Sequence, residues 1–370
     1  MYGAEVMLLN LACAQKRLGC EPVIGVFENM HQPHTELAKA ASERGLPVEI
    51  FPCRGRLDFK SLQRIQRSIR VSGACIVHGH GYKSDLYGFF SAKSMEVPFV
   101  ATCHLWTGAS LTIRFYEYLD SLILRRAEKV VGVSDSIADC LLKSGIPGHK
   151  ISVIYNGTDL PTTRDCQPTV RQELGVEENK LIVGTVGRLE EQKGLQYFIA
   201  AAKEVLVKLP DVLFVVAGEG SWRSRLEHMI SDLGLTSSVL LLGRRSDMAG
   251  IYASLDLFVL ASIDEGMPMT ILEALAACRA VVATRVGAVE KLIIPDRTGM
   301  LVEPRDVPAI RDAILRCLGN PSLARELGHN GEEHVRNSFS SDAMAKSYLK
   351  LYRQLLRERE TNVATSVQAA

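Results

Sequence analysis

The chain has 370 residues, a length that suggests two domains and excludes a small disulfide-stapled scaffold. Hydrophobic residues make up 47% and charged residues 23%, which supplies a core for each domain and excludes a wholly disordered chain. The 43 Lys and Arg residues against 42 Asp and Glu residues give a net charge of +1. This balance excludes a broadly basic nucleic-acid surface, so any anionic ligand must be held by a local site.

The nine cysteines are scattered, and no two form a Cys-x-x-Cys pair. This pattern is typical of a reduced, cytoplasmic protein without a structural zinc cluster. No run of about 18 apolar residues occurs, and the N-terminus has no signal-peptide pattern. We therefore expect a cytoplasmic protein, whose membrane contact, where it has one, is peripheral and on the inner face.

Short apolar runs alternate with helical patterns between residues 21 and 155, which predicts parallel strands joined by helical crossovers. The predicted strands are Pro22–Phe27, Val48–Phe51, Ala74–His78, Phe99–Cys103, Lys129–Val133 and Ile151–Tyr155. Residues 156–168 are rich in turn formers and are interpreted as an interdomain linker.

A second alternating series follows, with runs apolar enough for strands buried on both faces of a parallel sheet. Its predicted strands are Leu181–Gly187, Val212–Gly218, Val239–Gly243, Leu255–Leu260, Ala280–Thr284 and Gly299–Val302. The predicted fold class is α/β, with two doubly wound Rossmann-like domains facing a cleft. Their predicted bounds are 1–160 on the acceptor side and 161–340 on the donor side, then a helix over 341–360 that can cross back to the first domain, and a frayed tail over 361–370.

Two cations follow the first predicted strand of the second domain, in the segment G-R-L-E-E-Q-K-G. Ligands collect at the carboxyl ends of strands in open parallel sheets. Arg188 and Lys193 would lie there beside a helix N-terminus, an arrangement that suits a diphosphate. For an arbitrary basic pair, solvated surface charges are the plainer alternative.

The next predicted strand ends in A-G-E-G, where Gly218 and Gly220 permit a tight turn and a close backbone approach. The segment is not a dinucleotide-binding fingerprint. G-x-G-x-x-G would require a third glycine near Arg223 and an acidic residue about 20 positions further on. A dehydrogenase is therefore disfavoured.

The segment Asp264–Ala276, D-E-G-M-P-M-T-I-L-E-A-L-A, directly follows a predicted strand. Pro268 suits the first helical position, which places Glu265 in the loop and Glu273 about one and a half turns inside the helix. The helix N-terminus supplies free N–H donors for a phosphate or a sugar hydroxyl. Because the helix is apolar, we expect Glu273 to be a buried carboxylate whose partner is a ligand, rather than an ordinary solvent-facing glutamate.

These segments together resemble the retaining GT-B glycosyltransferases of the group 1, family four, type. The resemblance covers nearly the whole chain, and it implies the GT-B fold. Besides G-R-L-E-E-Q-K-G and E-G-M-P-M-T-I-L-E, the segments that carry it are G-A-E-V-M-L-L-N-L-A, A-T-C-H-L-W, G-V-S-D-S-I-A, V-I-Y-N-G-T-D and V-G-A-V-E-K-L-I-I-P-D-R-T-G-M-L-V.

The resemblance implies a role for each matching residue. Arg188 and Lys193 would bind the donor diphosphate and act as the leaving-group electrophile in place of a metal ion. Glu273 would hold the ribose, and Glu265 would contact the transferred sugar, either as a covalent nucleophile or, as we favour, by positioning a front-face attack. The implied donor site also includes Gly187, Gly218, Gly266 and Met267.

Three histidines of the first domain are further candidates. His104 matches the histidine that lines the sugar pocket in the family, although by itself it is explained as a hydrogen-bonded structural histidine. His78 and His80 can share a strand face and suggest two metal ligands. A structural or acceptor-side role is favoured for both, because no nearby third ligand and no compelling D-x-D motif occur.

The implied activity is transfer of a sugar from a nucleoside-diphosphate sugar, by preference UDP-linked, to a hydroxyl acceptor. The acceptor would be a glycan or a lipid-linked molecule in polysaccharide or cell-surface glycan synthesis, with no cofactor, no metal ion and no nucleic acid. Two alternatives stay open: a nucleotide-binding pseudoenzyme or assembly subunit, and a GT-B nucleotide-sugar epimerase or phosphorylase. Intact donor-site residues argue against the first alternative, whereas sugar released without an acceptor would favour the second.

The sequence departs from the family pattern at two places. Relatives usually begin with a strand and a Gly-rich loop, whereas Met1 and Tyr2 directly precede the G-A-E helix here. We expect that this strand is missing, that two strands thereby lose a ladder partner, and that the native protein extends upstream. An intact mass matching residues 1–370 would contradict that extension. Cys278 and Ala280 replace a common glycine and proline in a helix-to-strand turn that we expect to tolerate them.

Overall fold

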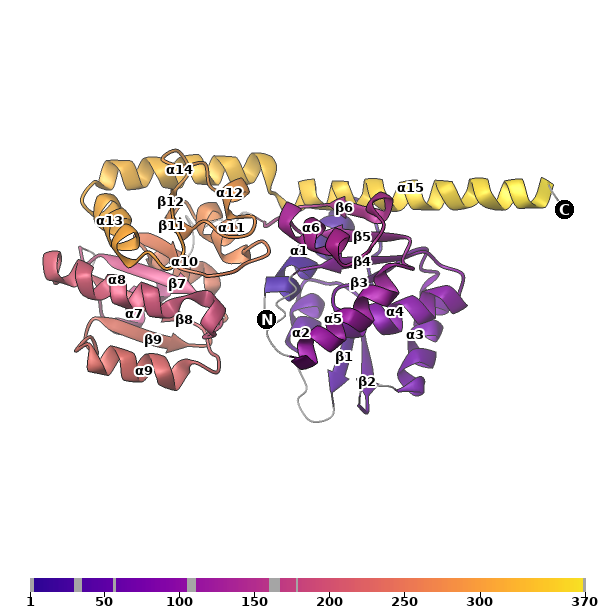
Figure 1. Cartoon of the computed structure of the whole chain (residues 1–370), viewed down its shortest axis with the longest axis horizontal. Coiled ribbons are helices and arrows are strands. Elements are labelled where there is room, and N and C mark those ends of the chain that lie inside the picture. The colour runs from indigo at the N-terminus through magenta and orange to yellow at the C-terminus, as the bar shows by residue number, and fades with distance from the viewer. Residues whose placement is uncertain are drawn as a thin grey trace. The chain divides into compact units, whose positions relative to one another are not determined.

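The computed structural model describes residues 3–29, 35–55, 58–104, 111–159, 167–177 and 179–368. The chain divides into two compact units (Figure 1): unit 1 is Met1–Gly157 with Ser341–Ala370, and unit 2 is Thr158–Ser340. The chain therefore passes between the units twice. Thr158 and Ser340 form a parallel bridge, so both passages leave unit 2 at adjacent points. The predicted linker over 156–168 lies partly outside the described residues, at 160–166.

Unit 1 consists of parallel strands and the helices that connect them. Its strands are β1 (Ile24–Asn29), β2 (Val48–Cys53), β3 (Val77–Gly79), β4 (Phe99–Cys103), β5 (Lys129–Gly132) and β6 (Ile151–Val153). Its helices are α1 (Gly3–Arg17), α2 (Glu36–Glu43), α3 (Phe59–Ser72), α4 (Tyr82–Ser94), α5 (Leu111–Leu124), α6 (Asp135–Lys143), the 3₁₀ turn η1 (Gly148–Lys150) and α15 (Ser341–Gln368).

The strands of unit 1 form two separate parallel sheets. One sheet pairs β1 with β2, and the other has the order β3-β4-β5-β6. Within the described part of the chain, β1 and β3 each have a single ladder partner. The four-stranded sheet places the carboxyl ends of β3 and β4 next to each other, and with them His80 and His104.

Helix α15 is distant in sequence from the rest of unit 1 but packs on it, against α1. Arg17 of α1 forms an ion pair with Asp342 at 2.7 Å, and the Tyr348 and Thr102 hydroxyl groups are hydrogen-bonded at 3.0 Å. The expectation of a frayed tail from Thr361 is corrected, because α15 continues to Gln368. Residues 361–368 contain no glycine or proline that would end a helix.

Unit 2 has a single parallel sheet covered by helices. Its strands are β7 (Ile182–Val186), β8 (Leu213–Ala217), β9 (Val239–Gly243), β10 (Leu257–Leu260), β11 (Ala280–Thr284) and β12 (Met300–Val302). Its helices are α7 (Thr169–Leu174), the 3₁₀ turn η3 (Glu191–Lys193), α8 (Leu195–Lys208), α9 (Arg223–Asp232), α10 (Met248–Ser254), α11 (Met269–Ala276), α12 (Val289–Leu292), α13 (Val307–Leu318) and α14 (Pro321–Ser338).

The sheet of unit 2 has the strand order β12-β11-β10-β7-β8-β9. From β7 the chain first builds β8 and β9 on one side and then β10, β11 and β12 on the other. Strands β8, β10 and β11 are buried along their whole length, as expected for a sheet with helices on both faces. The predicted α/β class with Rossmann-like units is confirmed. The strand order changes direction between β7 and β10, the position where such sheets bind ligands.

The turn from α11 to β11 contains a strained residue. Cys278 has a φ of 55°, in the left-handed region, which costs a side chain about 1–2 kcal/mol. Glycine avoids this cost but gains entropy in the unfolded chain. We expect Cys278→Gly to raise the free energy of unfolding by about 1 kcal/mol in urea denaturation. Cys75→Gly, at an exposed residue without a positive φ, is the control and should lower it. A lower stability for Cys278→Gly would contradict the argument.

Candidate active site

The loops after β7 and β10 are joined by their backbones. The amide N–H of Ile263 donates to the carbonyl of Gln192 at 2.8 Å. Gly194 has a φ of 60°, and a Cβ atom there would lie 1.9 Å from the carbonyl oxygen of Ala261. Only glycine allows this approach. The β7 loop is thereby fixed on the end of β10, which brings Lys193 and Glu265 together.

Lys193 and Glu265 form a largely buried ion pair. The Lys193 Nζ lies 2.6 Å from the Glu265 Oε1, and the two side chains are 18% and 7% exposed. The Ser262 hydroxyl donates to the same oxygen at 2.7 Å. Burying a pair of charges carries a desolvation cost that the attraction between them repays only in part. The ion pair therefore contributes little net stability, and its presence suggests a functional role.

Glu273 lies on α11 and has a protein partner. The Tyr252 hydroxyl, on α10, donates to the Glu273 Oε2 at 2.8 Å. We expected a ligand as the partner of this carboxylate, and the structure shows that a buried tyrosine satisfies one of its oxygens. Desolvation raises the pKa of Glu273 to about 7, although the hydrogen bond from Tyr252 acts in the opposite direction. No hydrogen bond to its Oε1 is found among the described residues, so this oxygen can accept from a ligand.

The predicted glycines place neighbouring loops in contact. A Cβ atom on Gly218, which has a φ of 153°, would lie 1.8 Å from the carbonyl oxygen of Gly187. The loop after β8 thus lies directly on the loop after β7, the loop that carries Arg188, an exposed residue. Gly187 and Gly218 shape this edge through their backbones, and their contact with a donor stays a prediction.

Helix α11 begins at the carboxyl edge of the sheet. Pro268 is its N-cap and Met269 its first residue, which corrects the predicted helical position of Pro268 by one residue. The side chain of Pro268 forms no capping hydrogen bond, so the N-cap residue does not hold the first N–H groups of the helix. Gly266 and Met267 are buried just before the helix, and the Gly266 carbonyl accepts from the Ala288 amide at 2.9 Å. The arrangement offers backbone donors close to Glu265.

In unit 1, His104 directly follows β4 and belongs to a histidine cluster. Its Nε2 lies 3.3 Å from the Nδ1 of His80. Burial lowers the pKa of His104 to about 4 and that of His80 well below its usual value, so both rings are neutral at pH 7. The Nε2 of His80 is buried and has no hydrogen-bond partner in the described part of the chain. His104 can therefore exchange hydrogen bonds with a sugar hydroxyl but does not act as a cation.

His78 is held by the protein on both sides. Its Nδ1 lies 2.6 Å from the Tyr352 hydroxyl and its Nε2 lies 2.7 Å from the Thr102 hydroxyl. Its ring is 4.1 Å from that of His80, so the predicted shared strand face is present. Both ring nitrogens of His78 are engaged, which suits a structural role. The described residues contain no group of three or more His, Cys, Asp or Glu side chains placed to hold a metal ion.

Comparison with known proteins gives a family. Residues 167–334 match the family described as "Glycosyl transferases group 1", and residues 1–161 match "Glycosyltransferase Family 4". The chain is 32% identical to a lipopolysaccharide core biosynthesis mannosyltransferase from Rhizobium leguminosarum, over 65% of this chain and 68% of the relative. The chain belongs to the group 1 glycosyltransferases. This assignment confirms the resemblance that the sequence motifs indicated.

Two further similar proteins have a nucleotide sugar in their names. One is the UDP-Gal:alpha-D-GlcNAc-diphosphoundecaprenol alpha-1,3-galactosyltransferase of Escherichia coli, 29% identical over 76% of each chain. The other is the crystal structure of Anabaena HepE in complex with UDP-glucose, with a TM-score of 0.83, 20% identity and 96% coverage of each chain. The structural likeness supports the GT-B fold.

Two residues of this glycosyltransferase's site were not predicted from sequence. Ser262 precedes Glu265 by three residues, and this spacing was the available signal for a hydroxyl that reaches the carboxylate. Tyr252 is separated from Glu273 by a strand and a loop, so only the packing of α10 on the sheet brings it there.

No helix in the described part of the chain is both long and apolar enough to cross a membrane.

The loop after β11 supports Glu265 through a glycine. Gly287 has a φ of 53°, and a Cβ atom on it would lie 1.9 Å from the carbonyl oxygen of Glu265. We expect Gly287→Ala to displace the Glu265 loop and to lower the free energy of unfolding. The left-handed backbone conformation alone costs an alanine about 1–2 kcal/mol, and the expected loss is larger than that. Gly234→Ala is the matched control, because Gly234 has a φ of 71° and nothing lies within 4 Å of its Cβ position. If chemical denaturation gave the same loss of unfolding free energy for both variants, the close approach at Gly287 would not contribute to stability.

Proposed function

We propose that this protein transfers a sugar from a UDP-linked donor to a hydroxyl group of a glycan or lipid-linked acceptor, with retention of the anomeric configuration and without a metal ion. The observation that carries the proposal is the Lys193–Glu265 ion pair at the carboxyl ends of β7 and β10. It lies where a parallel sheet binds ligands, in a chain of a glycosyltransferase family.

The leaving group gains negative charge as the bond between the sugar and the diphosphate breaks. Arg188 and Lys193 supply positive charge on the β7 loop, where Lys193 is held by its ion pair, and the N-terminus of α11 adds backbone donors. Groups held in place before the reaction stabilise this charge without reorganisation. In this proposal Gly187, Gly218, Gly266 and Met267 border the donor, while Glu273 accepts hydrogen bonds from the ribose hydroxyls.

Glu265 is proposed to position the transferred sugar. Its Oε1 is held by Lys193 and Ser262, which fixes the carboxylate in one orientation. In the front-face step that we favour, the bond from the anomeric carbon to the phosphate oxygen breaks as the bond to the acceptor oxygen forms. The acceptor proton passes to the departing phosphate. His104, a neutral hydrogen-bonding group, is proposed to contact the transferred sugar.

The names of similar proteins support the choice of donor and acceptor. One relative uses UDP-Gal and a diphosphoundecaprenol-linked acceptor, and another is a lipopolysaccharide core mannosyltransferase. A lipid-linked acceptor would place the protein at the cytoplasmic face of a membrane, in peripheral contact with it.

The test begins with binding of UDP, GDP, ADP and CMP, measured by calorimetry with and without EDTA. We expect UDP to bind and EDTA to leave its affinity unchanged. UDP-sugars are then supplied with lipid-linked and glycan acceptors, and the anomeric configuration of the product is read by NMR. A strict requirement for Mg²⁺, an inverted product, or sugar released without an acceptor would each contradict part of the proposal.

A further inference from the structure

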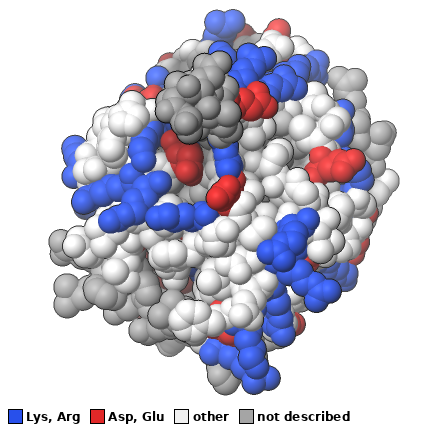
Figure 2. Space-filling view, turned by 90° about the vertical axis from the view of Figure 1, so that its right-hand side faces the viewer, with Lys and Arg blue, Asp and Glu red and all other residues white. Residues whose placement is uncertain are grey.

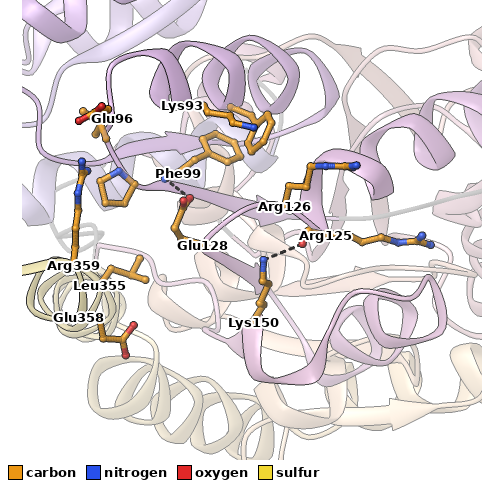
Figure 3. Close-up of a pocket in the computed structure, with 13 residues that line it drawn as sticks. Lys93, Glu96, Phe99, Arg125, Arg126, Glu128, Lys150, Leu355, Glu358 and Arg359 are labelled. Atoms are coloured by element: carbon orange, nitrogen blue, oxygen red, sulfur yellow. Dashed lines mark hydrogen bonds between the residues drawn. The ribbon is translucent and has the colours of Figure 1, made fainter. Parts of the chain in front are cut away.

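Unit 1 has a cavity of about 740 Å³ at the amino ends of β4, β5 and β6 (Figure 3). Phe99 begins β4 in the cavity wall, whereas Cys103 ends β4 next to His104. Four residue steps along a strand span about 13 Å. The cavity is therefore separate from the sheet edge that carries the histidine cluster, and the proposed transfer reaction does not use it.

The wall of the cavity is rich in positive charge. Five cationic and three acidic side chains line it, so its net charge is +2. The cations are Lys93, Arg125, Arg126, Lys150 and Arg359, and the acids are Glu96, Glu128 and Glu358. None of the five cations has an ion-pair partner within the described ranges. Figure 2 shows Lys and Arg side chains gathered on this face of unit 1, around a hollow that also holds acidic side chains.

Neutral groups orient three of the five cations. The Lys150 Nζ donates to the carbonyl oxygens of Arg125 and Ala127, each at 2.9 Å. The Arg125 guanidinium donates to the Ser144 carbonyl at 2.6 Å, and the Lys93 Nζ lies over the Phe89 ring at 5.9 Å. Carbonyls and rings orient a cation without cancelling its charge. The positive charge of Lys93, Arg125 and Lys150 is therefore pre-organised and still available to an anion.

Two of the three acidic side chains, Glu128 and Glu358, form hydrogen bonds with groups other than the five cations. The Glu128 Oε2 accepts from the Phe99 amide at 2.8 Å, which directs it at the strand (Figure 3). On α15, Glu358 points away from Arg359 and is hydrogen-bonded to Gln354 at 2.8 Å. Beneath the charges the wall is apolar, because Phe89, Phe99 and Leu355 line it and are buried. Cations above an apolar wall suit a phosphate group attached to an organic body.

We propose that this cavity is a second anion site, which binds a phosphate monoester or diphosphate on an organic ligand. The phosphate can belong to a lipid headgroup or to a soluble metabolite, and the cavity chemistry is the same for both. Leu355 and Arg359 lie on α15, the helix whose Tyr348 and Tyr352 contact Thr102 and His78. A ligand bound here also fastens α15 to the sheet, so it stabilises unit 1.

The test uses the full chain and sodium pyrophosphate, titrated by calorimetry in the Lys193→Met/Glu265→Gln background, which removes a cation from the proposed donor site without stranding the buried carboxylate. The variant is Lys93→Gln/Arg126→Gln/Arg359→Gln, which spares Lys150 because its ammonium group holds backbone carbonyls. The matched control is Lys60→Gln/Arg64→Gln/Arg67→Gln, which removes the same charge from α3. We expect the cavity variant to weaken pyrophosphate binding by about 30-fold or more, and the control to weaken it less than about threefold.

Co-sedimentation with phosphatidylcholine vesicles, with and without phosphatidylglycerol, separates the two sources. Vesicle binding that needs phosphatidylglycerol, is lost in the cavity variant and is competed by pyrophosphate assigns the site to a lipid headgroup. Pyrophosphate binding without vesicle binding assigns it to a soluble ligand. Equal losses in the cavity variant and the α3 control, or no pyrophosphate binding by the folded chain, would overturn the proposal. Neither outcome depends on whether UDP binds unit 2.

Discussion

Replacing Lys193 by methionine is expected to lower the rate constant of sugar transfer by about 10²- to 10³-fold at saturating donor, the usual effect of removing one group that stabilises developing negative charge. Methionine has a linear side chain one atom shorter than that of lysine, so the substitution removes the charged ammonium group and keeps most of the apolar stem. Lys193 lies 2.6 Å from Glu265, so the loss affects both the leaving diphosphate and the carboxylate proposed to position the sugar. Single-turnover kinetics with a UDP-sugar measure the effect.

The same substitution has a cost in stability that must be separated from the effect on rate. It leaves Glu265, which is 7% exposed, without its cation, and breaking a buried pair costs about 3–5 kcal/mol. Lys193→Met/Glu265→Gln removes the stranded charge and should recover most of the stability but not the rate. Lys203→Met, at an exposed lysine of α8, is the matched control and should leave both unchanged. Transfer by the single variant at nearly the wild-type rate would contradict the role of Lys193.

The fold could be predicted from the sequence because strands buried on both faces appear as continuous apolar runs. The run Val212–Gly218 contains all of β8, and each residue of that strand is buried. Shorter strands were placed less well: the run Ala74–His78 was predicted, whereas β3 covers Val77–Gly79. Strand ends depend on pairing with a neighbour, which the local pattern does not contain.

The residues of the candidate site could be predicted individually from the sequence, but the contacts between them could not. Lys193 and Glu265 were found because each follows a predicted strand, yet their contact requires β7 to lie beside β10. That adjacency follows from the strand order, which reverses direction at this point. Tyr252 was missed because nothing in α10 marks it as the partner of a carboxylate 21 residues later. The roles of these side chains stay predictions.

Replacing Glu273 by alanine is expected to lower the affinity for UDP-glucose by at least about 100-fold. In the proposed site the substitution removes two hydrogen bonds from the ribose hydroxyls to the Glu273 carboxylate, and a hydrogen bond to a charged group is worth about 1.5–3 kcal/mol. The substitution also leaves the buried Tyr252 hydroxyl without its acceptor. Glu273→Gln is the control, because its amide oxygen can still accept from Tyr252. It should preserve the fold while weakening binding, which separates loss of the ligand contact from loss of structure.

The affinity for UDP-glucose should also depend on pH, and the raised pKa of Glu273 predicts weaker binding at lower pH. Desolvation raises this pKa to about 7, so the carboxylate that we propose to accept from the ribose hydroxyls becomes protonated as the pH falls below 7. Affinity should fall about tenfold per pH unit there, since each unit of pKa corresponds to 1.36 kcal/mol. The diphosphate of UDP-glucose is a diester and does not titrate near neutral pH. Tyr252→Phe removes the hydrogen bond that lowers the pKa and should shift the midpoint upward. An unshifted profile, or one retained in Glu273→Gln, would exclude Glu273 as its source.

Stability should respond to pH in the opposite direction to affinity. A carboxyl group whose pKa is raised on folding contributes stability below its unfolded pKa, and this contribution is lost as the pH rises to about 7. Glu273→Gln should therefore be more stable than the wild type at pH 8 in chemical denaturation. A more stable Glu273→Gln at pH 8 would mean that ionised Glu273 lowers the stability of the free protein. That result would support a ligand as the reason for a glutamate at this position, because packing alone would favour the glutamine.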